Sequence, residues 1–238
     1  MKIDRFIEEV EKLGININED LLNKLEIYYQ FLTEYNSHTN LTAITEKDDV
    51  YLKHFYDSLT IKNAVDLNNI QTLIDIGSGA GFPGVVLKIF FPHISTTILD
   101  SNGKKTLFIS QLVEKLDLKD IKVINMRAED FAIEETNRYD LCVSRAVAYV
   151  DIISELSLPF IKEDGKVVLM KGSVTTELNI LEKHSNELNI NDFKVIKFNL
   201  PVIEDERNLI IITKKAKTTK ILSYNQILKR NKKWNPKV

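Results

Sequence analysis

The sequence has almost no cysteine: Cys142 is the single one among 238 residues. One cysteine excludes a disulfide framework and a cysteine-rich metal site, and it fits a reducing compartment. Cys142 stands in the middle of an apolar run, which favours a small buried residue over a catalytic nucleophile.

Long hydrophobic runs are missing as well. No apolar stretch reaches the roughly 18–20 residues that a membrane-spanning helix requires, and residues Met1–Arg5 carry charges in place of the apolar core of a secretory signal. Apolar residues nevertheless make up 44% of the chain, which is enough for a packed core. We therefore expect a folded, cytoplasmic protein without a membrane partner.

Acidic residues are absent from the C-terminal segment that runs from Lys214 to Val238, which holds nine lysines and arginines. The preceding 213 residues carry 23 basic and 34 acidic side chains, a balance of −11. A basic tail on an acidic body favours a polyanionic partner. A solvated tail that aids solubility is the alternative.

The hydrophobic pattern divides the chain into two regions. Residues 2–13, 19–36 and 47–64 carry apolar side chains at helical spacing, which predicts an N-terminal helical subdomain over residues 1–65. From residue 70 onward, short β-branched runs alternate with helical stretches. This alternation predicts an α/β, Rossmann-like fold with a mostly parallel sheet covered by helices on both faces.

The elements expected after residue 65 form a second domain, residues 66–214, which is followed by the basic tail, residues 215–238. The linker between the last two expected strands is short and contains Pro201, so the last of the seven strands is expected to be antiparallel. The expected strands are residues 72–76, 96–100, 121–125, 139–144, 166–170, 193–198 and 207–213, and the expected helices between them are residues 83–90, 103–116, 150–158 and 174–187.

Glycines crowd the segment after the first expected strand, with Gly77, Gly79, Gly81 and Gly84 in eight residues. Glycines at that place let the backbone turn tightly and approach a ligand closely. From Gly79 onward the run also matches the G-x-G-x-x-G pattern of dinucleotide sites. However, the strand already ends at Gly77, and Asp75 at its end would repel a pyrophosphate but accept hydrogen bonds from an amino group. The pattern favours S-adenosylmethionine, with a nicotinamide dinucleotide as the alternative.

Two further segments are candidates for the same cofactor. Asp100 ends the second expected strand, about 20 residues after the glycines, where a carboxylate can bind the ribose hydroxyls of either cofactor. The polar run Met126–Asp130 follows the third expected strand. We interpret it as a loop that offers backbone groups to an adenine edge, or alternatively as a loop that only caps the next segment.

Seven motifs, in order along the chain, carry a resemblance to a known family. They are Asn40–Ile44, His54–Leu59, Asp75–Gly84, Leu99–Ser101 with Lys104–Lys105, Arg127–Glu129, Ser144–Ala148 and Lys171–Gly172. Over roughly residues 25–215 the chain resembles the bacterial 16S ribosomal RNA guanine-N7 methyltransferases, also called glucose-inhibited division protein B. The resemblance implies a Rossmann-like methyltransferase that transfers a methyl group from S-adenosylmethionine to N7 of a guanosine in 16S ribosomal RNA or in a small-subunit assembly particle.

The resemblance also implies roles for single residues. The cofactor contacts carried over by motif are Gly77, Phe82, Ala128, Glu129 and Arg145, and Asp100 joins them by its strand-end position. The C-terminus departs from the family, whose members often end in a basic segment with proline and glycine. Here Lys229–Pro236 keeps the basic character without that motif.

The reaction that the resemblance implies needs no general base, because guanine N7 has a free lone pair and is nucleophilic without losing a proton. Positioning and electrostatics then supply the catalysis. The fourth expected strand is not followed by the Asn-Pro-Pro-Tyr or Asp-Pro-Pro-Tyr motif of exocyclic-amino methyltransferases. Arg145 and Lys171, at the ends of the fourth and fifth expected strands, are therefore assigned positioning roles. A surface ion pair is the alternative for Arg145.

The expected RNA contacts are basic residues near that strand-end rim and in the tail. Trp234 is a candidate for stacking on an unpaired base, and packing against the domain is its alternative. The full set of expected RNA-binding residues is Lys171, Arg207, Lys229, Arg230, Lys232 and Lys233. For Arg207 the alternative is an ion pair with Glu204 or Glu206.

His54 and Asp57 lie three residues apart, on one face of an expected helix. Without a third ligand nearby they predict no metal site. We expect them to orient the helical subdomain against the glycine loop. We expect a monomeric enzyme, and a non-catalytic ribosome-binding module of the same fold is the alternative function.

Overall fold

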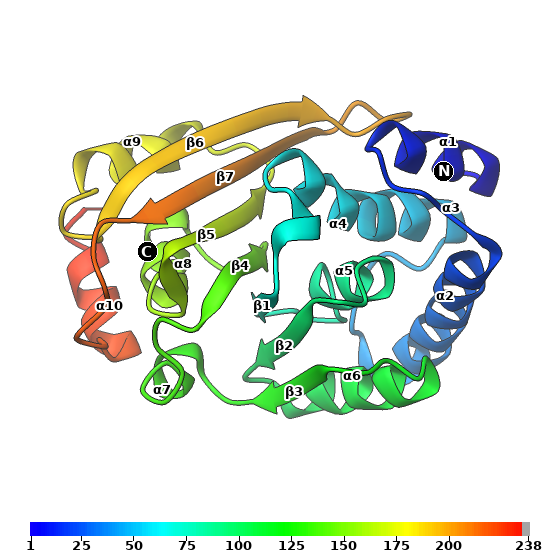
Figure 1. The fold of residues 1–238 in the computed structure, drawn as a ribbon, viewed down its shortest axis with the longest axis horizontal. Coiled ribbons are helices and arrows are strands. Elements are labelled where there is room, and N and C mark those ends of the chain that lie inside the picture. Colours follow the sequence, from blue (N-terminus) through cyan, green and yellow to red (C-terminus); the bar gives the residue numbers. More distant parts are fainter. Residues whose placement is uncertain (235–238) are drawn as a thin grey trace.

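The computed structural model describes residues 1–234, and the end of the predicted tail, residues 235–238 with Lys237, lies outside the described residues. Over residues 1–234 the chain forms a seven-stranded sheet in the order β3-β2-β1-β4-β5-β7-β6 (Figure 1). All seven predicted strands are confirmed: β1 (Thr72–Ile76), β2 (Ser95–Asp100), β3 (Ile121–Asn125), β4 (Tyr139–Arg145), β5 (Ile161–Lys171), β6 (Ile190–Asn199) and β7 (Glu206–Lys214).

The sheet directions also follow the prediction. Strands β1 to β5 pair in parallel, and β7 lies between β5 and β6 and is antiparallel to both. The strand order reverses between β1 and β4, because β2 and β3 continue to one side of β1 and β5 to the other. Connections that leave such a switch point in opposite directions open a crevice at the carboxyl ends of the two strands.

Helices cover both faces of this sheet (Figure 1). On one face α5 (Gly84–Phe90) packs on β1 and β2, and α6 (Gly103–Lys115) packs on β2 and β3. On the other face α8 (Val150–Ser157) packs on β4 and β5 and also contacts α9 (Thr175–Lys183). No helix among the described residues is long and apolar enough to cross a membrane.

The N-terminal region is helical, as predicted, but its second half is broken into short pieces. The helices α1 (Ile3–Lys12) and α2 (Glu19–Thr39) are regular. The segment predicted as one or two helices over residues 47–64 is a run of four short elements: α3 (Lys47–Val50), the π-helical turn η1 (Tyr51–Tyr56), α4 (Asp57–Leu59) and the 3₁₀ turn η2 (Thr60–Asn63). A further 3₁₀ turn, η3 (Leu67–Asn69), precedes the sheet.

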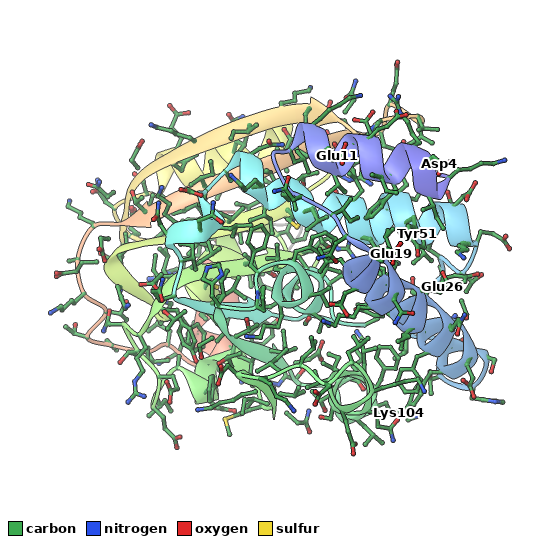
Figure 2. The ribbon with its side chains drawn as sticks, turned by 45° about the vertical axis from the view of Figure 1, so that its right-hand side comes forward. Asp4, Glu11, Glu19, Glu26, Tyr51 and Lys104 are labelled. Carbon is green, nitrogen blue, oxygen red and sulfur yellow. The ribbon has the colours of Figure 1, made fainter. Side chains whose placement is uncertain are left out.

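These N-terminal elements share one apolar core with the sheet. Phe6 and Tyr28, both fully buried, belong to the same cluster as Leu73 of β1 and Val143 of β4. Figure 2 views this region from the side, with Tyr51 of η1 and Glu26 of α2 labelled, and the Tyr51 hydroxyl donates a hydrogen bond to the Glu26 carboxylate (3.3 Å). One continuous core joins the N-terminal helical region to the sheet domain. The predicted division of the chain into three domains therefore stays a prediction.

Two helices of the structure were not predicted from the sequence. The polar run after β3 contains α7 (Ala128–Phe131), where we predicted a loop, and the basic tail contains α10 (Tyr224–Asn231). The start of α10 has a capping box, in which the Ser223 and Gln226 side chains each bind the other residue's backbone. This arrangement satisfies amide groups that a helix otherwise leaves unpaired at its first turn.

Candidate functional site

The glycine loop after β1 turns at positions that favour glycine. Gly77, Gly79 and Gly81 have φ angles of +69°, +63° and +98°, a region that side chains disfavour. The Gly77 amide donates to the Leu99 carbonyl (2.7 Å), and the Gly79 amide donates to Oδ2 of Asp100 (3.0 Å). The loop is thereby fixed to the carboxyl end of β2.

Asp75 lies beneath this loop and is fully buried. Its Oδ2 accepts hydrogen bonds from the Ser78 hydroxyl (2.6 Å) and the Gly84 amide (2.7 Å), so the carboxylate closes the turn and caps the start of α5. Among residues 1–234 no group donates a hydrogen bond to the Oδ1 of Asp75. Burial raises the pKa of Asp75 to about 6, so at neutral pH it is an anion with one oxygen left to accept a donor.

The ring of Phe82 ties the loop to the N-terminal helices. It is only 3% exposed and stacks on Tyr28 (ring centroids 5.2 Å apart, planes at 6°) and on His54 (4.3 Å, 21°). The Tyr28 hydroxyl donates to the Ala80 carbonyl (2.5 Å) in the same loop. Sequence analysis expected Phe82 to touch the cofactor, whereas the structure places its ring in packing between elements. The expected role of His54 in orienting the helical region against this loop is confirmed.

A cavity of about 300 Å³, here called the smaller cavity, lies in front of the glycine loop. Gly77 and Asp100 line it together with Ala128 and Glu129, so the predicted loop, strand-end acid and post-β3 segment do come together. Gly79 and Gly81 shape the loop and are not among the residues that line the cavity. The remaining lining residues are Ile76, Leu99, Ser101, Lys105, Met126, Arg127, Ala146, Val147, Ala148, Leu156 and Tyr224.

A second cavity of about 650 Å³, the larger cavity, lies on the other side of the loop that follows β4. Ala146, Val147 and Ala148 of this loop line both cavities. Ala146 has a φ of +55°, a left-handed conformation that costs a non-glycine residue about 1–2 kcal/mol. A Cβ on Gly77 would lie 2.5 Å from Cγ2 of Val147. The two cavities therefore meet at this strained loop, directly above the glycine turn.

Arg145, the last residue of β4, lines the larger cavity and is held in one orientation. Its Nη1 donates to the Lys53 carbonyl (2.9 Å) and to Oδ2 of Asp57 (3.2 Å). Its Nη2 lies 3.1 Å from Nδ1 of His54, and its guanidinium carbon lies 5.1 Å from the centre of the Phe82 ring. Arg145 is thus anchored by the N-terminal region rather than by a surface ion pair.

The protonation state of His54 follows from these contacts. Burial, followed by the charge of Arg145, lowers the pKa of His54 to about 3, so the ring is neutral at physiological pH. Its Nδ1 faces both the Arg145 guanidinium and the Lys53 carbonyl, each at 3.1 Å, and its Nε2 lies 3.0 Å from the Thr42 hydroxyl.

Asp57 joins the two arginines of the larger cavity. It is 3% exposed, and its two carboxylate oxygens face Arg145 and the Nε of Arg207, the latter at 3.3 Å. Arg207 also lies 3.9 Å from the Asp205 carboxylate. The ion pair weighed for Arg207 is therefore present, but its main partner is Asp57, about 150 residues away in sequence, instead of Glu204 or Glu206.

Lys171 is engaged within the protein. Its ammonium donates to the Ala148 carbonyl and lies 3.1 Å from Oε2 of Glu177. The same oxygen accepts the Val150 amide at 2.6 Å and so caps α8. This differs from the expected contact with an RNA phosphate, because the charge of Lys171 is already paired. The Lys171–Glu177 pair instead fixes the loop between the two cavities.

The tail is folded against the domain. Arg230 forms an ion pair with the buried carboxylate of Glu155, and Trp234 stacks on His184 (4.1 Å between ring centres, 12°). The packing alternative for Trp234 is the one the structure contains. The guanidinium of Arg230 pairs with Glu155 while its side chain stays 32% exposed, so its RNA contact stays a prediction. The remaining tail residues predicted to bind RNA are exposed: Lys229, Lys232 and Lys233.

The comparison with known proteins agrees with this geometry. A family model described as rRNA small subunit methyltransferase G matches residues 21–216. The chain belongs to this family. Proteins named Ribosomal RNA small subunit methyltransferase G from Bacillus thuringiensis (strain Al Hakam) and Bacillus cereus (strain AH820) are each 43% identical to it over 223 residues, which cover 92% of this chain and 93% of the relative.

As a member of the rRNA small subunit methyltransferase G family, the chain is an S-adenosylmethionine-dependent methyltransferase, and the nicotinamide alternative is set aside. Solved structures share its fold. A ribosomal protein L11 methylase from Lactobacillus delbrueckii subsp. bulgaricus aligns with a TM-score of 0.52 and 16% identity over 68% of this chain and 79% of that one. A putative caffeoyl-CoA O-methyltransferase from Staphylococcus aureus aligns with the same TM-score and identity over 78% and 91%. At these identities the likeness concerns the fold alone.

Three residues that line the cavities of this rRNA small subunit methyltransferase G family member were not predicted from the sequence. Val147 was only part of a motif, Glu177 belonged to an ordinary expected helix, and Tyr224 lay in a segment taken as a charged arm. Only Tyr224 had a recognisable signal, since Ser223 followed three residues later by Gln226 is a capping-box pattern. No local pattern marks Glu177, whose partners come from β5 and α8.

Substituting Asp57 with alanine is expected to lower the free energy of unfolding by about 2–3 kcal/mol. Loss of one partner of a fully buried ion pair costs about 3–5 kcal/mol, and the effect is smaller here because the side chains of Arg145 and Arg207 stay 16% and 21% exposed. The measurement is urea denaturation, with Asp20→Ala as control, since Asp20 pairs with Lys24 on the surface of α2. Equal stability of the two variants would contradict the anchoring role.

Proposed function

We propose that this enzyme transfers a methyl group from S-adenosylmethionine to N7 of a guanosine in 16S ribosomal RNA of the small ribosomal subunit. The observation that carries the proposal is the meeting of the two cavities at Ala146–Ala148, with Arg145 fixed on the wall of the larger one. The smaller cavity then takes the cofactor and the larger cavity takes the flipped-out base. We propose that the enzyme acts as a monomer in the cytoplasm.

The residues around the smaller cavity fit this cofactor in their chemistry. Asp75 lies beneath the glycine loop and does not line the cavity, and no described group donates to its buried Oδ1. Its negative charge would attract the cationic α-amino group of the cofactor through the loop. Asp100, at the end of β2, suits the ribose hydroxyls. Ala128 and Glu129 line the same cavity as Gly77 and would hold the adenine.

The chain's own contribution to the reaction is positioning. When bound, S-adenosylmethionine supplies an electrophilic methyl group, and guanine N7 attacks it with a lone pair that carries no proton. Arg145, held by four neighbouring groups, would hydrogen-bond the O6 edge of the guanine and align N7 for in-line attack. Lys171 would act through Ala148, keeping the loop between the cavities in place.

RNA contacts are proposed for basic residues of the larger cavity and of the tail. Arg207 lines the larger cavity and, although it pairs with Asp57, keeps 21% of its side chain exposed and would contact the flipped nucleotide or its phosphate. Lys229, Lys232 and Lys233 lie exposed on the tail and would attract the phosphate backbone. Arg230 pairs with Glu155, keeps 32% of its side chain exposed and would add to the same attraction. The substrate is 16S ribosomal RNA, naked or within an assembly particle.

The cofactor assignment is tested by calorimetric titration of the enzyme with S-adenosylmethionine and with NAD. We expect saturable binding of S-adenosylmethionine and none of NAD, because Asp75 and the early end of β1 at Gly77 disfavour a pyrophosphate. Methyl transfer from labelled S-adenosylmethionine to purified small-subunit RNA then separates an enzyme from a binding module of the same fold. Tight binding of NAD alone would overturn the proposed site.

The single-turnover rate at saturating cofactor is expected to be nearly constant from about pH 6.5 to 8.5. Guanine N7 needs no base, His54 stays neutral because its pKa is about 3, and Asp75 stays ionised because its pKa is about 6. Below pH 6 cofactor affinity should fall, since Asp75 takes up a proton and loses its attraction for a cation. A rate that rises tenfold per pH unit near pH 7 would contradict the absence of a general base.

A further inference from the structure

The tail helix α10 presents two kinds of side chain on one face. Tyr224, Ile227, Leu228 and Asn231 are spaced i, i+3, i+4 and i+7, which places them on the same side of a helix. Ile227 and Asn231 are buried, and Leu228 packs in the core cluster of the α8 face. The first residue of this row, Tyr224, packs against the same cluster and also lines the smaller cavity.

Several contacts hold α10 in this position. At its C-terminal end Arg230 pairs with the carboxylate of Glu155, which is only 4% exposed, and the Asn231 amide donates to the same residue at 3.5 Å. Trp234 stacks on His184 at the end of α9. The tail is thus anchored on α8, the helix that begins directly after the loop between the two cavities.

The N-terminal end of α10 is fixed against the other wall of the smaller cavity. The guanidinium carbon of Arg127 lies 5.5 Å from the centre of the Tyr224 ring, a cation–π contact. Arg127 directly precedes Ala128 and Glu129, which line the same cavity. The capping box of Ser223 and Gln226 sets where the helix starts and hence which way Tyr224 points.

We infer that Tyr224 is a cofactor-binding residue, and that α10 is a structural wall of the adenosine end of the S-adenosylmethionine site rather than only a charged arm for RNA. The inference rests on the proposed placement of the cofactor in the smaller cavity. An aromatic ring fits the flat face of an adenine, and this ring lies beside the post-β3 segment to which we assign the adenine. The tail thereby joins a cofactor contact to the exposed lysines of the same helix.

The inference is tested by calorimetric titration of full-length variants with two ligands, S-adenosylhomocysteine and 5′-methylthioadenosine, which share the adenosine half. Tyr224→Leu should weaken both affinities by the same factor, roughly 5- to 150-fold, the range that loss of a stacking aromatic ring gives. Tyr224→Phe keeps the ring and should bind both ligands within about twofold of wild type. Asn225→Ala, on the exposed face of α10, is the matched control and should leave both affinities unchanged.

Asp100→Ala separates failure of this inference from failure of the proposed cofactor site. If Asp100→Ala weakens binding and Tyr224→Leu does not, the cofactor site stands and the role of Tyr224 is overturned. If neither variant changes affinity, the cofactor does not lie in the smaller cavity and both proposals fall. A loss confined to S-adenosylhomocysteine would place the ring at the amino-acid end and would also overturn the inference. Equal melting temperatures of Tyr224→Leu and Tyr224→Phe would show that α10 stays docked in both variants.

Discussion

Replacing Arg145 with alanine is expected to lower the single-turnover rate of methyl transfer by at least about 100-fold, the typical cost of a misplacement near 1 Å at a reacting centre. The guanidinium is fixed by the Lys53 carbonyl, Asp57, His54 and the Phe82 ring. Alanine removes the group that we propose to orient the guanine toward the methyl group from the wall of the larger cavity. Cofactor affinity should change much less, because Arg145 does not line the smaller cavity.

Two further variants test whether the loss of rate comes from the guanidinium group of Arg145. Arg145→Lys keeps a positive charge but not the planar fork that reaches several partners at once, so its rate should stay well below that of wild type. Arg138→Ala is the matched control, because Arg138 precedes the other end of β4 and is 62% exposed. A folded Arg145→Ala enzyme with an unchanged rate would remove Arg145 from the mechanism.

Replacing Gly77 with valine is expected to weaken S-adenosylmethionine binding by at least about 100-fold, or roughly 2.7 kcal/mol. Gly77 has a φ of +69°, which disfavours a branched side chain, and its Cβ would lie 2.5 Å from Cγ2 of Val147. The added side chain must push the loop between the cavities or fill the space beside the glycine turn. Either outcome damages the proposed site, and calorimetric titration measures the loss.

The control for backbone strain is Gly14→Val. Gly14 has a similar φ of +73°, and no atom of the described residues lies within 4 Å of the position of its Cβ. That variant should lose some stability and keep its cofactor affinity. Adding Val147→Ala to Gly77→Val tests the cause, since restored affinity would show that the collision with Val147, and not contact with the cofactor, produces the loss. Unchanged affinity in Gly77→Val would refute the site.

The sequence was sufficient to predict the sheet and several of the residues that line the smaller cavity, because both depend on local patterns. Each strand is a short β-branched run, and the alternation with helices sets the direction of the strands. Gly77, Asp100 and the post-β3 segment follow three successive strands of a parallel sheet, so their meeting at one edge follows from topology. Glycines at positive φ angles are likewise predictable from a tight turn.

What the sequence could not provide were the partners of charged side chains. Arg145 and Arg207 both reach Asp57, but the three residues come from different parts of the chain. The same holds for Lys171, which meets Glu177, and for Arg230, which meets Glu155. Arg145, Lys171 and Arg207 were assigned from their strand-end positions, and Arg230 from the charge of the tail. Neither kind of evidence shows which charges pair within the protein.

The tail illustrates a different limit. Its lack of acidic residues suggested a tail that binds a polyanion or stays in solvent, yet the helical row from Tyr224 to Asn231 and its capping box favour a docked helix. High charge on one face of a helix does not oppose docking of the other face. The consequence for function is that Lys229, Lys232 and Lys233 would approach RNA from a fixed position near the cofactor.

The central claim is that this enzyme methylates N7 of a guanosine in 16S ribosomal RNA. It is tested most directly by incubating the purified enzyme with labelled S-adenosylmethionine and small-subunit RNA, and locating the methyl group by nuclease digestion and mass spectrometry. Our account predicts one labelled nucleoside, 7-methylguanosine, at a single position, with the label lost in Arg145→Ala. Label on an exocyclic amino group, on a ribose or on a pyrimidine carbon would contradict it.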